Sequence, residues 1–66
     1  MNYKQVILRL NAFIDRETLF IKGYKLSASN TKDKRKRSSY LGLIAKYKKN
    51  IATQKYMIEL INKSEI

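Results

Sequence analysis

Isoleucine recurs every seven residues in the first and last thirds of the chain, and this spacing constrains the fold more than any other feature. The two series are Ile7, Ile14 and Ile21, and Ile44, Ile51 and Ile58. A seven-residue apolar repeat is typical of an α-helix that packs along one seam, as in a coiled coil. The chain contains no proline that would interrupt such a helix. The repeat therefore predicts two long helices.

We label the isoleucines heptad position a, which gives the d positions of the same seams. These are Tyr3, Leu10, Glu17 and Tyr24 in the first helix, and Tyr40, Tyr47, Gln54 and Ile61 in the second. We expect helices over about residues 2–27 and 39–63, with Ser38 or Ser39 as the cap of the second. The polar residues 28–38 are expected to form the loop between them. An alternative interpretation makes residues 19–26 a short strand, from the alternation of Leu19, Ile21 and Gly23, but the seven-residue period fits more positions.

A single fold-back at about residue 32 aligns the two seams. It sets Ile21 opposite Ile44 and Tyr24 opposite Tyr40, and it continues layer by layer to the termini. The sequence therefore predicts an all-α fold, an antiparallel two-helix hairpin that resembles a coiled coil, with residues 1–66 as one small domain. In this register the two polar d residues face different partners. Glu17 is expected to face Tyr47, and Gln54 to face Leu10, and both fix the register at some cost in stability.

Composition argues against an enzyme and against a cofactor or metal ion. The chain has no cysteine and no histidine, which excludes disulfides, thiolate or imidazole metal ligands, and cysteine or histidine catalysis. Asp15 and Glu17 are two residues apart and point to nearly opposite sides of a helix. No uninterrupted apolar run is longer than three residues, as at residues 6–8, which is too short to span a membrane. We expect a soluble, cytoplasmic binding protein.

Positive charge is concentrated in the middle of the sequence. The whole chain carries +10, and residues 22–49 contain ten basic residues with Asp33 as their only acid. In the predicted hairpin this segment forms a strongly basic loop tip, while the ends of the chain are nearly neutral. The ten residues are Lys22, Lys25, Lys32, Lys34, Arg35, Lys36, Arg37, Lys46, Lys48 and Lys49.

A polyanion would relieve the mutual repulsion of these charges, and nucleic acid is the commonest intracellular polyanion. We expect sequence-independent contacts to the phosphate backbone, with DNA preferred to RNA as the partner. Tyr24 and Tyr40 lie near the tip and could stack on bases, although their d positions favour a role in the core. Two other interpretations of the basic run are a loop that only maintains solubility and a site for anionic lipid.

A second surface is apolar. Bulky residues at position g widen the seam, and a two-helix hairpin of this size buries little without a partner. We expect these residues to contact a larger protein or a second copy of the chain. The predicted interface residues are Val6, Phe13, Phe20, Leu43 and Met57.

Two functional hypotheses follow from these surfaces. The first is a non-enzymatic accessory protein that binds nucleic acid at its tip while it docks on a larger protein. A composition rich in Lys, Ile, Asn and Tyr is typical of AT-rich genomes and suggests a replication or recombination system of a mobile element or phage. The second is a protein-directed modulator, such as a phage-type inhibitor or adaptor, that binds an acidic or nucleic-acid-binding surface of a host protein.

Overall fold

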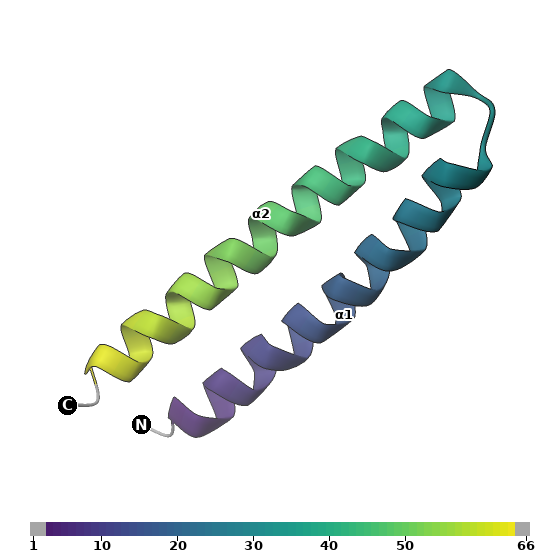
Figure 1. The fold of residues 1–66 in the computed structure, drawn as a ribbon. Coiled ribbons are helices and arrows are strands. Elements are labelled where there is room, and N and C mark those ends of the chain that lie inside the picture. Colours follow the sequence, from purple (N-terminus) through teal and green to yellow (C-terminus); the bar gives the residue numbers. More distant parts are fainter. Residues whose placement is uncertain (1–2, 65–66) are drawn as a thin grey trace.

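Two antiparallel helices make up the computed structural model, which describes residues 3–64. Helix α1 comprises Tyr3–Asn30, helix α2 comprises Lys34–Ser64, and residues 31–33 connect them (Figure 1). The helix ends opposite the connection lie side by side. The predicted all-α hairpin is confirmed, and the alternative of a strand at residues 19–26 is wrong because these residues continue α1. Residue 2, where the first helix was expected to begin, lies outside the described residues.

The predicted loop at residues 28–38 is too long. Both helices extend into it and leave only three residues between them. The predicted cap at Ser38 or Ser39 is wrong, because Asp33 caps α2: its Oδ1 accepts hydrogen bonds from the backbone N–H groups of Arg35 at 2.9 Å and Lys36 at 3.4 Å. Lys and Arg are good helix formers, so the basic run after an Asp cap forms the first turn of α2.

The seam residues are the least exposed part of the molecule, as the heptad pattern predicts. The a and d positions are buried or half-buried along both helices, except Arg37, which occupies an a position near the loop. Among residues 3–64 the buried ones are Ile21, Ala28 and Ile44, which are still 8%, 7% and 6% exposed. The molecule is a rod with principal-axis extents of 51 × 14 × 12 Å and a radius of gyration of 15.3 Å. A compact domain of this length would have a radius of gyration of about 11 Å.

The register differs from the predicted one. The ring of Tyr24 stacks on both Tyr40 and Tyr47, with centroid distances of 6.0 Å to each. The pairing of Tyr24 with Tyr40 is therefore confirmed, but the d residue of α1 lies between two d residues of α2. Like positions do not face each other directly, because the helices are staggered by about half a heptad.

This stagger explains a polar contact near the middle of the rod. Glu17 precedes Tyr24 by seven residues, one heptad along the seam, and its Oε1 accepts a hydrogen bond of 3.2 Å from Gln54 Nε2. Tyr47 was the expected hydrogen-bond donor to the Glu17 carboxylate, but the donor is Gln54, which was expected to face Leu10. The second acceptor of each group, Glu17 Oε2 and Gln54 Oε1, is buried without a hydrogen-bond partner.

The two glycines lie inside helices and have open space around them. A Cβ atom added to Gly23 or Gly42 would meet no atom within 4 Å. We expect Gly23→Ala and Gly42→Ala each to raise the free energy of unfolding by up to about 1 kcal/mol, because glycine is the poorest helix former after proline. Urea unfolding followed by circular dichroism would measure this, and a loss of stability would contradict the open space around the two glycines.

Candidate nucleic-acid interface

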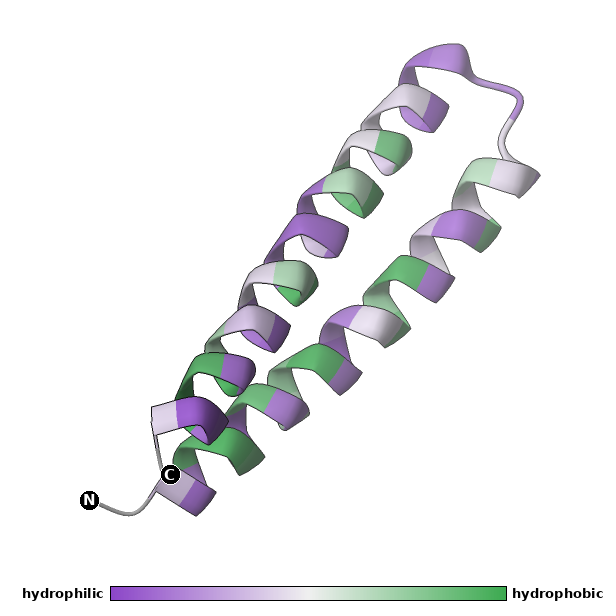
Figure 2. Ribbon diagram, turned by 60° about the vertical axis from the view of Figure 1, so that its left-hand side comes forward, coloured by the Kyte–Doolittle hydropathy of each residue, from purple (hydrophilic) through white to green (hydrophobic). Residues whose placement is uncertain are grey.

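The basic tip is the half of the rod nearest the loop, and it carries the ten predicted basic residues. All ten are exposed to solvent. Lys22 and Lys25 extend from the last third of α1, Lys32 lies in the connection, and the others lie in the first half of α2. Figure 2 shows the hydrophilic colour gathered over the connection and the first turn of α2. The structure therefore brings together all ten residues at one end.

Asp33, the one acid of the basic tip, is held by local hydrogen bonds. Its carboxylate accepts the two backbone N–H bonds that cap α2, and its own N–H donates to Thr31 Oγ1 at 3.2 Å. A carboxylate at a helix N-terminus is also favoured by the helix dipole. Asp33 is therefore occupied as a cap, and it leaves the surrounding lysines without another acid inside the tip.

Arg37 differs from the other basic residues because it bonds to the end of α1. Its Nε–H donates a hydrogen bond to the carbonyl oxygen of Ala28 at 3.3 Å. A terminal NH₂ group of the guanidinium donates a second one to the carbonyl oxygen of Thr31 at 2.8 Å. The last carbonyl groups of a helix have no partner within the helix, so Arg37 closes the C-terminus of α1. This residue has a structural role that its sequence position did not suggest.

We predict that Arg37→Ala lowers the free energy of unfolding by about 1–2 kcal/mol, because two charge-assisted bonds at a partly solvated site are lost. Arg37→Lys should recover only part of this, since an ammonium group lacks the planar fork. Arg35→Ala removes the same charge from an exposed position two residues earlier and should leave stability nearly unchanged. Equal stability of the two alanine variants in urea unfolding would contradict the structural role of Arg37.

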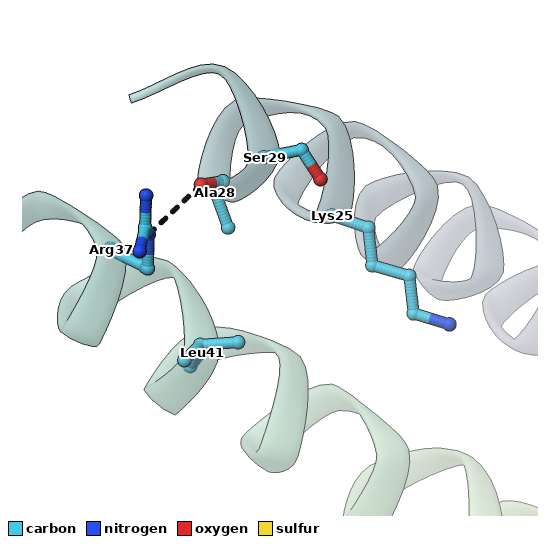
Figure 3. Close-up of a pocket in the computed structure, with 5 residues that line it drawn as sticks. All are labelled: Lys25, Ala28, Ser29, Arg37 and Leu41. Carbon is cyan, nitrogen blue, oxygen red and sulfur yellow. Dashed lines mark hydrogen bonds between the residues drawn. The ribbon is translucent and has the colours of Figure 1, made fainter. Parts of the chain in front are cut away.

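A shallow hollow of about 410 Å³ lies beside Arg37, between the two helices. Figure 3 shows Lys25, Ala28 and Ser29 of α1 and Arg37 and Leu41 of α2 around it. Lys25 and Leu41 occupy e positions, and Ala28 and Arg37 occupy a positions. The e residues of both helices thus flank the same side of the seam.

The e positions form a lysine face that sequence reasoning missed. In an antiparallel hairpin the e residues of both helices flank one side of the seam, and the g residues flank the other. Leu41 is the only large apolar residue on this side. Lys4 and Lys55 belong to the face but lie outside the predicted basic segment. The signal was present as a lysine at most e positions of the two helices: Lys4, Lys25, Lys34, Lys48 and Lys55.

The tyrosines near the tip belong to the seam. Tyr24, Tyr40 and Tyr47 are half-buried, the ring of Tyr24 stacks on the other two, and Phe20 contacts Tyr47 with a centroid distance of 5.5 Å. The interpretation of Tyr24 and Tyr40 as core residues is therefore the one that the contacts favour. The contact of Phe20 at position g with Tyr47 at position d also shows that g residues flank the d side of the seam.

The apolar face consists of the five predicted interface residues, all at g positions on the side opposite the lysine face. Val6, Phe13, Phe20 and Met57 are between 41% and 47% exposed, whereas Leu43 is half-buried. Asn50 is the one polar g residue between Leu43 and Met57, and it is half-buried too. The guanidinium of Arg16 lies over the ring of Phe13 at 5.9 Å. Four of the five predicted residues thus expose a large apolar side chain.

No group of three or more His, Cys, Asp or Glu residues that could hold a metal ion occurs among residues 3–64. Neither α1 nor α2 is long and apolar enough to cross a membrane, as judged over the same residues. Comparison with protein-family models, with curated proteins and with solved structures finds no match for this chain.

Proposed function

We propose that this protein binds nucleic acid through the basic tip as a non-enzymatic accessory protein, without sequence specificity. The observation that carries the proposal is the concentration of ten exposed cationic side chains at one end of the rod, where the only acid is occupied as a helix cap. The rod is 51 Å long, several times the Debye length of about 8 Å at physiological salt. The tip therefore acts on a ligand as a separate charged site.

The dimensions of the rod favour contacts to phosphates. Its cross-section of 14 × 12 Å is at least as wide as the major groove of B-DNA, which is about 12 Å across. Two helices side by side do not enter such a groove, so the lysines meet the backbone on its rim. Phosphate contacts position a protein on DNA but carry no sequence information. This supports sequence-independent binding, and the preference for DNA over RNA stays a prediction.

Titration of a labelled DNA duplex at several salt concentrations tests the proposal. With four to six phosphate contacts, the logarithm of the binding constant should fall against the logarithm of the salt concentration with a slope of about −4 to −5. Titrations of a DNA single strand and of an RNA duplex of equal length show which kind of nucleic acid the protein binds most tightly. No binding even at low salt would contradict the proposal.

The alternative proposal is a protein-directed modulator whose basic tip binds an acidic or nucleic-acid-binding surface of another protein. The same ten side chains would serve this purpose, so the tip alone does not separate the two functions. Tight capture of a specific protein by a chain that binds no DNA would replace the first proposal with this one. Three further points stay predictions: docking on a larger protein, a location in the cytoplasm, and a role in a replication or recombination system of a mobile element or phage.

A further inference from the structure

We propose that the apolar face packs against the apolar face of a second copy, to form an antiparallel four-helix bundle with the basic tips at opposite ends. This inference is independent of nucleic-acid binding, because it rests on the apolar g residues and Asn50 and not on the ten basic residues of the tip. It rests on the exposed area, on the common level of the two g rows and on the distribution of charge.

The solvent-accessible surface of the hairpin is larger than that of a typical folded monomer of the same mass. The structure has a solvent-accessible surface of 5590 Å² for 7.8 kDa. Folded monomers of this mass expose about 4,400 Å². The difference of roughly 1,200 Å² exceeds the area of about 800 Å² that each partner buries in a standard interface. A second copy that covered this excess would bury an area typical of a stable dimer.

The g rows of the two helices are centred at nearly the same level. In α1 the row is Val6, Phe13, Phe20 and Ser27, with its centre between Phe13 and Phe20, and in α2 the centre lies at Asn50, between Leu43 and Met57. Tyr24 lies between Tyr40 and Tyr47, so the antiparallel register sets the centre of the α1 row level with about residue 51. The two centres thus differ in height by about one residue, or about 1.5 Å.

One two-fold axis at this level pairs the g row of α1 with that of the second α1, and the g row of α2 with that of the second α2. It sets Phe13 of one copy opposite Phe20 of the other, Val6 opposite Ser27, and Leu43 opposite Met57. Asn50 then meets its own counterpart at the axis, where two amide groups can each donate and accept a hydrogen bond. A buried asparagine pair in an apolar interface fixes register and oligomeric state. This gives the half-buried Asn50 a role that the single hairpin does not provide.

The charge distribution selects the antiparallel arrangement. Residues 22–49 carry +9, and the rest of the chain carries +1. A parallel dimer would bring two basic tips together, which is repulsive, whereas the antiparallel dimer separates them along a rod of 51 Å. The lysine faces remain on the outside, because they lie on the opposite side of each hairpin.

Sedimentation equilibrium in the micromolar range, at moderate salt, tests the association. We expect the mass of two chains. The double variant Phe13→Ser, Phe20→Ser should raise the dissociation constant by about a hundredfold or more, because apolar rings of both copies lose their burial. The matched control is Leu19→Ser, Leu26→Ser, which changes two more exposed residues of the same helix, 66% and 65% exposed, outside the apolar face. A monomeric wild type, or an equal effect of the control, would overturn the proposal.

Single cysteines test the arrangement, since the chain has none of its own. Asn50→Cys lies at the axis and should form a disulfide-linked dimer on mild oxidation. Leu43→Cys lies one heptad away and should not link to itself, although it should link to Met57→Cys when the two variants are mixed. Self-linking of Leu43→Cys at the rate of Asn50→Cys, in a protein that sediments as a dimer, would contradict the antiparallel two-fold.

Discussion

Reversal of three charges at the tip, Lys34→Glu, Arg35→Glu and Lys36→Glu, should lower the affinity for DNA about a hundredfold or more. Each cation beside an anionic surface contributes about 1 kcal/mol, and three fewer phosphate contacts should reduce the salt slope by about 3. Acidic residues are favourable in the first turn of a helix, so we expect α2 to keep its fold. Titration of labelled DNA and circular dichroism measure the two effects.

The matched control reverses three lysines near the termini, Lys4→Glu, Lys55→Glu and Lys63→Glu. Both triple variants lower the net charge from +10 to +4. The control residues are exposed as well. If the tip is the binding site, the control should lose much less affinity than the tip variant. Equal losses would mean that net charge alone drives binding, and would contradict a localised site. Arg37 is kept in both variants because its guanidinium closes the end of α1.

Replacement of both Glu17 and Gln54 by leucine should stabilise the protein, whereas Gln54→Leu alone should destabilise it. The single change leaves the Glu17 carboxylate without its hydrogen bond beside an apolar seam, which costs about 1–3 kcal/mol. The double change removes two acceptors that are buried without partners and adds apolar contact area. We expect a gain of about 1–3 kcal/mol in the free energy of unfolding.

Urea unfolding at one fixed chain concentration measures both variants. Thr18→Leu with Thr53→Leu is the control, because these neighbours are exposed and lie outside the seam. Their hydroxyl groups only bond to backbone carbonyls of their own helices, so the control should change stability by about 0.5 kcal/mol or less. A gain from Gln54→Leu alone, or a loss from the double variant, would contradict the stated cost of the buried polar contact.

The seven-residue repeat was sufficient to predict the helices, their antiparallel packing and the residues of the seam. It was insufficient for the register, because aligning isoleucine with isoleucine assumes that like positions face each other. The stagger is visible only in the contacts, where Tyr24 lies between Tyr40 and Tyr47. The pairing of Glu17 with Gln54 follows from it and was therefore missed.

At the tip, the sequence was misleading about secondary structure, because a run of basic residues was interpreted as a loop. Residues 34–37 looked like a loop because they are all charged, yet lysine and arginine are good helix formers and Asp33 is a preferred cap. Which ten basic residues make up the tip could be predicted from the distribution of charge along the chain. The separate role of Arg37 could not, because it depends on the position of the Ala28 and Thr31 carbonyl groups in the folded hairpin.

Backbone amide NMR during titration with a short DNA duplex tests the central claim most directly. If the tip binds DNA, the signals that shift should belong to residues 22–49, above all to Lys32, Lys34 and Lys36, and added salt should reverse the shifts. Signals of residues 4–16 and 55–63 should stay in place. Shifts centred on those terminal segments, or no shifts at low salt, would contradict binding of nucleic acid by the basic tip.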